Sequence, residues 1–244
     1  MKIWASLAAA VLALSAAISP AAEPRRSGYD DSSRETQAMQ DDDAGNPAFL
    51  WVRQGEALWD QDCKGCHGAA GTLRGVAARY PLFDPRANRL LTLEQRIVQC
   101  RTDRMGAPAF AWDDERLLAL SALVGLQSRG LPLNAEPREP FLSQGEALFR
   151  ERIGQLNLSC AQCHEERAGL RLSGATIPQG HATGYPAYRL EWQGMGSLYR
   201  RLRNCLNGVR AEVFAPDSPE AAALALYLAV RAKGMRVETP AVRP

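Results

Sequence analysis

The residues with the clearest chemical meaning form two short motifs, in which two cysteines are separated by two residues and followed directly by a histidine. The motifs are Cys63-Lys64-Gly65-Cys66-His67 and Cys160-Ala161-Gln162-Cys163-His164. On a short helical turn this spacing lets both thiols add to the vinyl groups of one haem, while the histidine reaches the iron. A zinc site would need more Cys and His ligands than a chain with 3 histidines offers, and a redox dithiol would not need the histidine. The motifs therefore predict two covalently bound c-type haems.

This prediction gives a role to each reactive residue of the motifs. The attachment residues are Cys63, Cys66, Cys160 and Cys163, and the axial iron ligands are His67 and His164. Each iron then has a sixth position, which a second ligand can fill or which can stay open. The remaining histidine, His181, occurs in only one half of the chain, and we interpret it as a loop or surface residue. Met105, Met195 and Met235 are other common haem ligands, but they do not occupy matching places in the two halves.

Two further cysteines, Cys100 and Cys205, do occupy matching places, one after each motif. Three interpretations compete for them. They could form a disulfide with each other, they could be small buried hydrophobic residues, or each could give a thiolate to the iron of its own half. The third interpretation suits a feature that is kept in both halves, and an anionic sulfur ligand would stabilise ferric iron and give low reduction potentials.

An arginine stands four residues before each of these cysteines, Arg96 before Cys100 and Arg201 before Cys205. Positions i and i+4 share one face of a helix, so each arginine is expected one turn from its cysteine. A cation there favours the thiolate and can hold an oxyanion beside the sulfur. The second cysteine has more arginines around it: we take Arg210 as a further candidate for substrate binding, and Arg200 and Arg203 as solvent-facing.

Both halves contain the same order of elements. Gln54-Gly55-Glu56-Ala57-Leu58-Trp59 recurs as Gln144-Gly145-Glu146-Ala147-Leu148-Phe149, each copy leads into a haem motif, and each half ends in a Leu- and Ala-rich helix, over 115–128 and 219–233. Thr92 with Gln95 predicts a capping box, and Ser197 predicts a helix N-cap. We therefore expect an all-α fold of two tandem cytochrome c-like domains, residues 47–136 and 137–244, related by internal duplication. The Gly- and Pro-rich stretches 68–88 and 168–196 are predicted to be long loops that wrap the haems.

The first residues have the pattern of a secretory signal peptide: Lys2, an apolar run over 7–18, and small residues near position 21. A membrane anchor is the alternative, but the run is shorter than the roughly 20 apolar residues that a span needs. We predict a signal peptide at 1–21, a flexible polar leader at 22–46, a periplasmic location and no membrane span. The net charge of +2 gives no reason to expect nucleic-acid binding.

Beyond the haem motifs, two segments resemble those of a known family. The run Arg201-Leu202-Arg203-Asn204-Cys205-Leu206-Asn207-Gly208-Val209-Arg210-Ala211 and the ending Glu238-Thr239-Pro240-Ala241-Val242-Arg243-Pro244 are similar to SoxA, the catalytic cytochrome subunits of SoxAX complexes in periplasmic sulfur oxidation. The haem motifs alone are general to c-type cytochromes, so these two segments are the specific part. The resemblance covers the chain from about residue 47 to its end.

The resemblance implies an activity and a set of partners. A SoxA-type protein pairs with a small monohaem SoxX, joins thiosulfate oxidatively to a cysteine of the carrier SoxYZ as a cysteine S-thiosulfonate, and passes two electrons to a c-type cytochrome. The catalytic haem of the family is the C-terminal one, whose ligands fall on His164 and Cys205; the family's ligand cysteine can carry a persulfide sulfur, and its active-site arginine falls on Arg201. The ligands of the N-terminal haem fall on His67 and Cys100.

Two other functions remain alternatives at this point. A thiosulfate dehydrogenase that forms tetrathionate also uses a His/Cys haem, but these enzymes generally pair it with a His/Met haem, which Cys100 argues against. A non-enzymatic dihaem electron carrier is expected to have methionine or histidine ligands in both halves and no cation beside the ligand sulfur.

Overall fold

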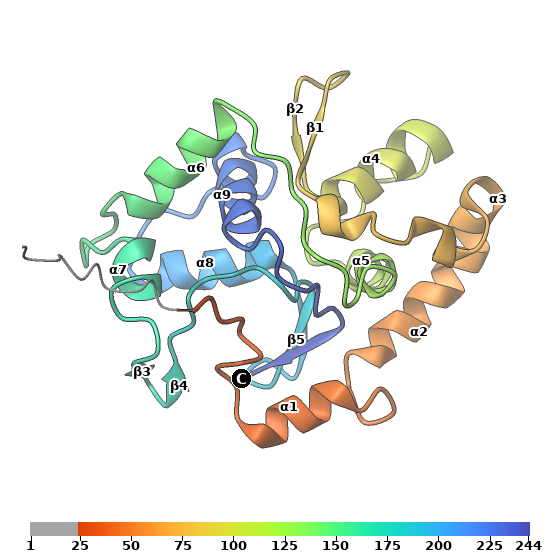
Figure 1. Cartoon of the computed structure of the whole chain (residues 1–244). Helices are drawn as coiled ribbons and strands as arrows, with labels where there is room; N and C mark the ends of the chain where they lie inside the picture. Colours follow the sequence, from red (N-terminus) through yellow and green to blue (C-terminus); the bar gives the residue numbers. More distant parts are fainter. Residues whose placement is uncertain (1–23) are drawn as a thin grey trace, which may run out of the picture.

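The computed structural model describes residues 24–244, so the predicted signal peptide at 1–21 lies outside the described residues. Helices make up most of the regular secondary structure (Figure 1). The first half contains α2 (Phe49–Leu58), the π-helical turn η1 (Trp59–Cys63), α3 (Lys64–His67), the 3-10 turns η2 (Ala70–Leu73) and η3 (Ala77–Arg79), α4 (Leu93–Met105) and α5 (Glu115–Leu126). The second half contains α6 (Phe141–Arg150), α7 (Cys160–His164), α8 (Leu198–Gly208) and α9 (Pro219–Arg231).

The predicted helix starts are confirmed by their caps. Thr92 and Gln95 form the capping box of α4: the Thr92 hydroxyl accepts the Gln95 N–H at 3.3 Å, and the Gln95 side-chain oxygen accepts the Thr92 N–H at 2.9 Å. The Ser197 hydroxyl accepts the Arg200 N–H at 3.1 Å at the start of α8. These bonds satisfy backbone donors that a helix start leaves free.

Each half is built on a pair of closely crossing helices, α2 on α5 in the first and α6 on α9 in the second. The repeated Gln-Gly-Glu-Ala-Leu segment supplies a glycine at each crossing. A Cβ atom at Gly55 would overlap the Ala119 carbonyl group, and one at Gly145 would overlap the Ala223 carbonyl group. The absence of a side chain at the same position of both copies is therefore what lets the two helices of each pair touch.

Short strands lie within the two predicted loops and also at residues 89–91 and 241–243, so the all-α prediction is too simple. They are β1 (Leu82–Asp84), β2 (Arg89–Leu91), β3 (Arg171–Leu172), β4 (Ala175–Thr176), β5 (Ala187–Arg189), β6 (Gly194–Gly196) and β7 (Ala241–Arg243). β1–β2 and β3–β4 are hairpins, and β6-β5-β7 is a mixed sheet in which β7 joins parallel to β5. Runs of two or three residues are too short to show the alternating pattern that reveals a strand.

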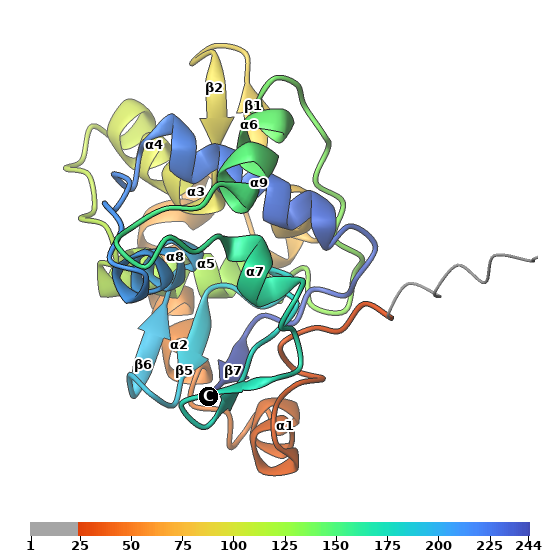
Figure 2. The same ribbon diagram turned by 90° about the vertical axis from the view of Figure 1, so that its left-hand side faces the viewer.

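The prediction of a flexible leader at 22–46 is also wrong for the part that the structure describes. Residues 34–41 form α1 (Arg34–Asp41), capped by Ser33, and α1 lies beside β7 and the end of the chain (Figures 1 and 2). The Gln40 side-chain oxygen accepts the Val242 N–H at 3.0 Å, and the Asn46 amide donates to the Pro240 carbonyl at 3.0 Å. The segment is ordered by polar bonds to the C-terminal tail, which a search for apolar periodicity does not detect.

The two halves share their hydrophobic core. The largest cluster, centred on α2 and α5, also contains Tyr188, Met195 and Val242 from the second half. A second cluster places Leu90 of β2 against Ala222 and Leu226 of α9. No helix within residues 24–244 is long and apolar enough to cross a membrane.

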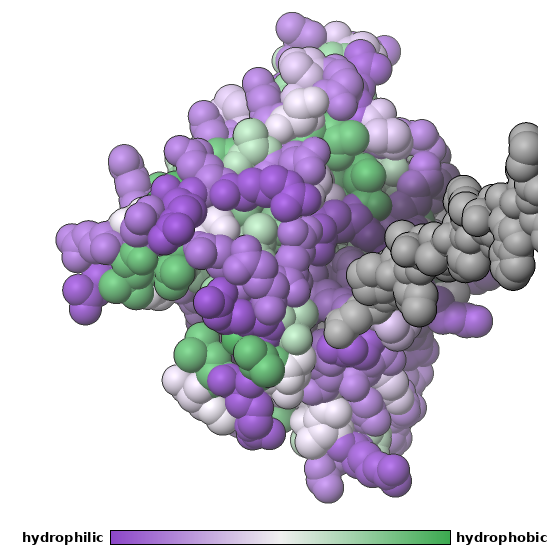
Figure 3. Space-filling view, turned by 60° about the vertical axis from the view of Figure 1, so that its left-hand side comes forward, coloured by the Kyte–Doolittle hydropathy of each residue, from purple (hydrophilic) through white to green (hydrophobic). Residues whose placement is uncertain are grey.

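The face shown in Figure 3 is mainly polar, and its apolar groups form small separate patches. The large hydrophobic side chains that stay exposed are Leu50, Met105, Leu156, Leu170 and Leu172. Scattered exposed residues of this kind are ordinary for a folded protein.

Candidate functional site

The second haem motif is a single capped helical turn, α7. The Ser159 hydroxyl accepts the Gln162 N–H at 3.2 Å, and the Gln162 side-chain oxygen accepts the Ser159 N–H at 3.0 Å. This capping box holds Cys160, Cys163 and His164 on one turn, as haem attachment requires.

The His164 ring is fixed by a contact at Nδ1, which is the nitrogen that is not expected to bind iron. Its Nδ1 lies 2.7 Å from the Pro178 carbonyl oxygen. Donation of Nδ1–H to this carbonyl leaves Nε2 with a free lone pair for a metal. Burial lowers the pKa of His164, and the nearby charges of Arg201 and Arg231 act in the same direction, so the ring is favoured in the neutral form that binds iron.

A cavity next to His164 brings the predicted catalytic residues together. Its walls include Cys160, His164, Arg201 and Cys205, and the apolar side chains Phe149, Leu202, Leu224 and Leu228 cover part of it. Burial raises the pKa of the Cys160 thiol to about 11, and the neighbouring Cys205 adds to the shift. Cys205 therefore lies at the motif of its own half.

The same relation holds in the first half. Burial raises the pKa of the Cys63 thiol to about 11, and Asp62 and then Cys100 add to the shift, so Cys100 lies near the first motif. No two of the six cysteines are joined in a disulfide. The structure thus gives no support to a disulfide between Cys100 and Cys205, and neither of these two side chains is fully buried.

The first motif lies on a more open part of the molecule. Cys66 and His67 are exposed, and the motif continues α2 through the turn η1. The indole Trp59 Nε1–H donates to the Gly68 carbonyl at 2.9 Å, and Arg101 of α4 contacts Asp62 at 3.3 Å. These two contacts fix the turn from both of its ends.

The two matching arginines have different surroundings. Arg96 pairs with the Asp84 carboxylate at 2.9 Å and donates to Gln99 at 2.7 Å. The Arg201 guanidinium makes no hydrogen bond or ion pair with any side chain or carbonyl of residues 24–244, although it lines the cavity. Only the second arginine is available to bind an anion from solution.

The other arginines near Cys205 lie away from the cavity. Arg210 is exposed, with a left-handed φ of 56°, in the turn after α8, and it is not part of the cavity wall. The Arg200 guanidinium lies 4.3 Å from the centre of the Trp192 ring. The structure does not bring Arg210 to the site, and its predicted role in substrate binding remains a prediction.

The remaining candidate ligands are also placed by the structure. Met195 is buried in the main core, Met105 is exposed at the end of α4, and Met235 packs against a separate cluster, so none of them lines the His164 cavity. His181 does line it, half-buried, with its Nδ1 2.7 Å from the Arg26 carbonyl oxygen. His181 is thus a loop residue, as predicted, but it also belongs to the wall of the site.

Several wall residues had no signal in the sequence. Pro178 orients His164 through a carbonyl oxygen, which any residue type can provide. Gly180 lets the loop approach the ring, since a Cβ there would lie 3.2 Å from the His164 Cβ. Asp31 lines the cavity from the segment that the sequence predicts to be a leader.

The residues present fit covalently bound haem. In each half two thiols and a histidine lie on one short helical stretch with a further cysteine nearby, which is a donor set of sulfur and imidazole suited to haem iron. In the second half an apolar wall and an oriented histidine complete the fit. In the first half the fit rests on the donor set.

Comparison with known proteins gives a consistent family assignment. The model of the SoxA/TsdA cytochrome c domain matches residues 53–133 and again residues 144–237. The L-cysteine S-thiosulfotransferase subunit SoxA of Rhodovulum sulfidophilum is 36% identical over 229 residues, which cover 89% of this chain and 80% of the relative. The subunit of the same name from Pseudaminobacter salicylatoxidans is 37% identical over 221 residues, covering 86% and 77%.

A solved structure agrees with the sequence comparisons. The crystal structure of SoxXA from P. pantotrophus matches with a TM-score of 0.87 and 32% sequence identity, over 90% of this chain and 87% of that chain. The similarity extends over both halves and is not limited to the haem motifs.

Proposed function

Because the chain belongs to the SoxA family of cytochrome c proteins, we propose that it is the catalytic subunit that couples thiosulfate to a cysteine of a SoxYZ-type carrier. The thiol and thiosulfate form one sulfur–sulfur bond, giving a cysteine S-thiosulfonate, one proton and two electrons. The electrons leave to a c-type cytochrome. The names of the relatives, L-cysteine S-thiosulfotransferase subunits, support this reaction.

The observation that carries the proposal is the cavity in which Cys205, Arg201 and His164 meet. A haem held by Cys160, Cys163 and His164 supplies one-electron redox chemistry at this place. Cys205 lines the same cavity, so its sulfur would be the second protein ligand that holds the haem iron together with His164. The unpaired Arg201 guanidinium binds the sulfonate end of thiosulfate through charge-assisted hydrogen bonds.

We also propose two haems and a tandem architecture. The cytochrome c assignment implies covalent haem c, and the matching motif with His67 and Cys100 supports a second one in the first half. The two matched segments and the glycine-mediated helix crossing of each half support two cytochrome c-like domains, 47–136 and 137–244, that arose by duplication. The similarity to SoxXA supports a SoxX-like monohaem partner, and the N-terminal pattern supports export to the periplasm by a signal peptide.

A turnover assay tests the activity. The protein with its SoxX-like partner is supplied with thiosulfate and an oxidised c-type cytochrome, with and without the carrier, and the carrier is weighed by intact-mass spectrometry. We expect carrier-bound thiosulfonate and no turnover without the carrier. Free tetrathionate formed without the carrier would instead identify a thiosulfate dehydrogenase, the alternative activity considered from the sequence.

Replacement of Cys205 by Ala tests the site. We expect haem to stay attached, since Cys160 and Cys163 remain, and coupling to fall to background. Low-temperature EPR of the ferric protein should lose one of two thiolate-ligated signals. Cys100→Ala is the matched variant and should lose the other signal. Wild-type coupling by the Cys205→Ala variant would refute the assigned role.

A further inference from the structure

The hydroxyl group of Tyr185 is available to a molecule bound in the cavity around Cys205. Tyr185 is half-buried and lines this cavity together with His164, Arg201 and Cys205. Its phenol oxygen makes no hydrogen bond to any group of residues 24–244. It is also not one of the enclosed polar atoms that lack a partner, so the oxygen is open to a cavity and not sealed inside the protein.

The other hydroxyl groups on the cavity wall are partly used by the fold. The Ser32 hydroxyl donates to a backbone carbonyl at 2.6 Å, and the Thr183 hydroxyl donates to Glu238 at 2.8 Å. The hydroxyls of Thr176, at the end of β4, and Tyr185 have no such partner within residues 24–244. These two groups are therefore free to bind a molecule that enters the cavity.

The charges that act on the Tyr185 phenol show where it lies. Arg201 has the largest effect, followed by Arg189, Arg243 and Cys205, and all four of these residues line the cavity around Cys205. The tyrosine also borders a neighbouring cavity between the two halves, but the charged groups place its phenol end in the cavity around Cys205. The phenol is thus close to Arg201, whose guanidinium has no partner within residues 24–244.

Tyr185 keeps its hydrogen at neutral pH. Burial raises the pKa of Tyr185, and the lowering effect of the nearby arginines is smaller, so the pKa lies above the ordinary value of a tyrosine. The phenol can therefore donate a hydrogen bond to an anion. Beside an unpaired guanidinium, this donor makes a site that offers several hydrogens to one oxyanion.

The C-terminal tail fixes the backbone of Tyr185. The Thr239 hydroxyl donates to the Tyr185 carbonyl at 3.0 Å. A Cβ on the preceding Gly184 would lie only 2.7 Å from the Ala241 Cβ, so the two segments touch there. Tyr185 therefore begins its side chain from a closely packed part of the fold.

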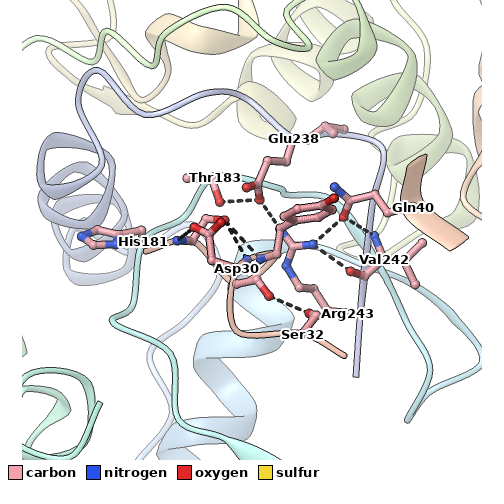
Figure 4. Close-up of polar contacts among 12 residues, drawn as sticks. Asp30, Ser32, Gln40, His181, Thr183, Glu238, Val242 and Arg243 are labelled. Carbon is pink, nitrogen blue, oxygen red and sulfur yellow. Dashed lines mark hydrogen bonds and ion pairs between the residues drawn. The ribbon is translucent and has the colours of Figure 1, made fainter. Parts of the chain in front are cut away.

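A polar network holds the segment before Tyr185 to the same tail. In Figure 4 the Thr183 hydroxyl binds Glu238, and Arg243 of β7 joins Glu238 to Gln40 of α1. The Arg243–Gln40 bond is 2.6 Å long. A binding group that stands on such a fixed backbone has its position set before a ligand arrives, which lowers the cost of binding.

We propose that the Tyr185 hydroxyl, together with Arg201, binds the sulfonate group of thiosulfate. The proposal rests on the coupling reaction described above. A guanidinium donates two parallel N–H bonds to an oxyanion, which leaves a further sulfonate oxygen to accept the phenol O–H. Held at its sulfonate end, the ion keeps its sulfane sulfur free to form the bond with the carrier sulfur.

Tyr185→Phe tests the proposal, because it removes the hydroxyl and keeps the ring. In the coupling assay with the partner, the carrier and thiosulfate, we expect the KM for thiosulfate to rise about 10-fold, as for the loss of a hydrogen bond to a charged group. The kcat should stay within about two-fold of the wild type, because this bond holds the ion before and during the reaction alike. The dissociation constant of thiosulfate, measured by calorimetry without the carrier, should rise by the same factor as the KM.

Tyr188→Phe is the matched control. Tyr188 lies in the main core, its hydroxyl is 3.5 Å from the Gln193 side chain, and it does not line the cavity. This variant should keep the KM and the dissociation constant of the wild type. The midpoint of thermal unfolding reports whether both variants fold as the wild type does.

Spectroscopy identifies the acceptor of the phenol hydrogen bond, since haem carboxylates and the Cys205 sulfur could also accept it. The resonance Raman band of haem propionate bending and the EPR signals of thiolate-ligated ferric iron are recorded without thiosulfate. Both should be the same in Tyr185→Phe as in the wild type. A shifted propionate band would show that the phenol binds a haem carboxylate, a shifted EPR signal that it binds the Cys205 sulfur, and either result would overturn the proposal.

Two kinetic results would also overturn it. A wild-type KM in Tyr185→Phe would show that the hydroxyl faces only water, and an equal rise in Tyr188→Phe would show that the KM responds to any lost tyrosine hydroxyl. Absence of thiosulfonate on the carrier with the wild-type protein would instead refute the coupling function, and this outcome is seen before any variant is made. The calorimetric comparison of Tyr185→Phe with the wild type still tests the binding site in that case.

Discussion

At the scale of single residues, the two halves use the same position for different purposes. Arg96 and Arg201 both stand one helical turn before a cysteine. Arg96 is bound to Asp84 and Gln99, while Arg201 lines the cavity with no partner among residues 24–244. The first arginine ties α4 to the β1–β2 hairpin. The second has its hydrogen-bond donors available for an oxyanion.

Because of this difference, we expect the same substitution to change the KM for thiosulfate at Arg201 and the stability of the fold at Arg96. Arg201→Gln should raise the KM for thiosulfate about 10- to 100-fold, because hydrogen bonds to charged groups contribute about 1.5–3 kcal/mol, and should leave the unfolding midpoint unchanged. Arg96→Gln is the matched control and should lower the unfolding midpoint without changing the KM. Steady-state kinetics and thermal unfolding of both variants check this, and equal KM values in the two variants would contradict it.

The site was partly predictable at this scale. Cysteines and histidines at fixed spacing indicate haem attachment directly, and the four-residue spacing of Arg201 and Cys205 on α8 predicts that they share a face. Pro178, Gly180 and Asp31 had no such signal, because they reach the site through a carbonyl oxygen, a missing side chain and a distant loop. Their roles depend on tertiary contacts, which local spacing does not encode.

At the scale of elements, helices pack very closely at the two crossings, α2 on α5 and α6 on α9. Gly55 meets the Ala119 carbonyl of α5, and Gly145 meets the Ala223 carbonyl of α9. Both obstacles are backbone groups, which cannot move aside as a flexible side chain can. The helices must separate to accept even one methyl group.

We therefore expect Gly145→Ala to destabilise the protein by about 1–3 kcal/mol or more, the usual cost of overpacking a core, despite the higher helix propensity of Ala. Gly55→Ala should have a similar effect. Gly208→Ala, at the end of α8 with no atom within 4 Å of its added Cβ, is the control and should be neutral. Urea unfolding measures all three, and an unchanged midpoint for Gly145→Ala would show that the crossing is looser than described.

The elements were predictable where local signals specify them. The capping residues of α4 and α8 and the Leu- and Ala-rich composition of α5 and α9 identify these helices. The parallel pairing of β5 with β7 joins residues 187–189 to residues 241–243, and three-residue strands contain too little pattern to reveal it. Helix α1 has a Ser33 cap that sequence could have suggested, but its place beside β7 depends on polar bonds such as that of Gln40.

At the scale of the whole molecule, the two halves of the chain are not independent bodies. Tyr188, Met195 and Val242 of the second half complete the core of the first, while Leu90 of the first half packs into the cluster of α9. Disruption on one side of this shared core removes contacts from both halves, so we expect the halves to unfold together.

Leu90→Ala tests this coupling. The side chain is 3% exposed and contacts the α9 cluster, so its truncation should cost about 2–5 kcal/mol. Amide hydrogen exchange should then speed up by the same factor in α2 and α5 as in α6 and α9, because all four would exchange through one global opening. Leu172→Ala removes the same atoms from an exposed position and should leave exchange unchanged in all four helices. Faster exchange in α6 and α9 alone would mean that each half opens by itself, and the shared clusters would then be a contact surface between two separate folding units.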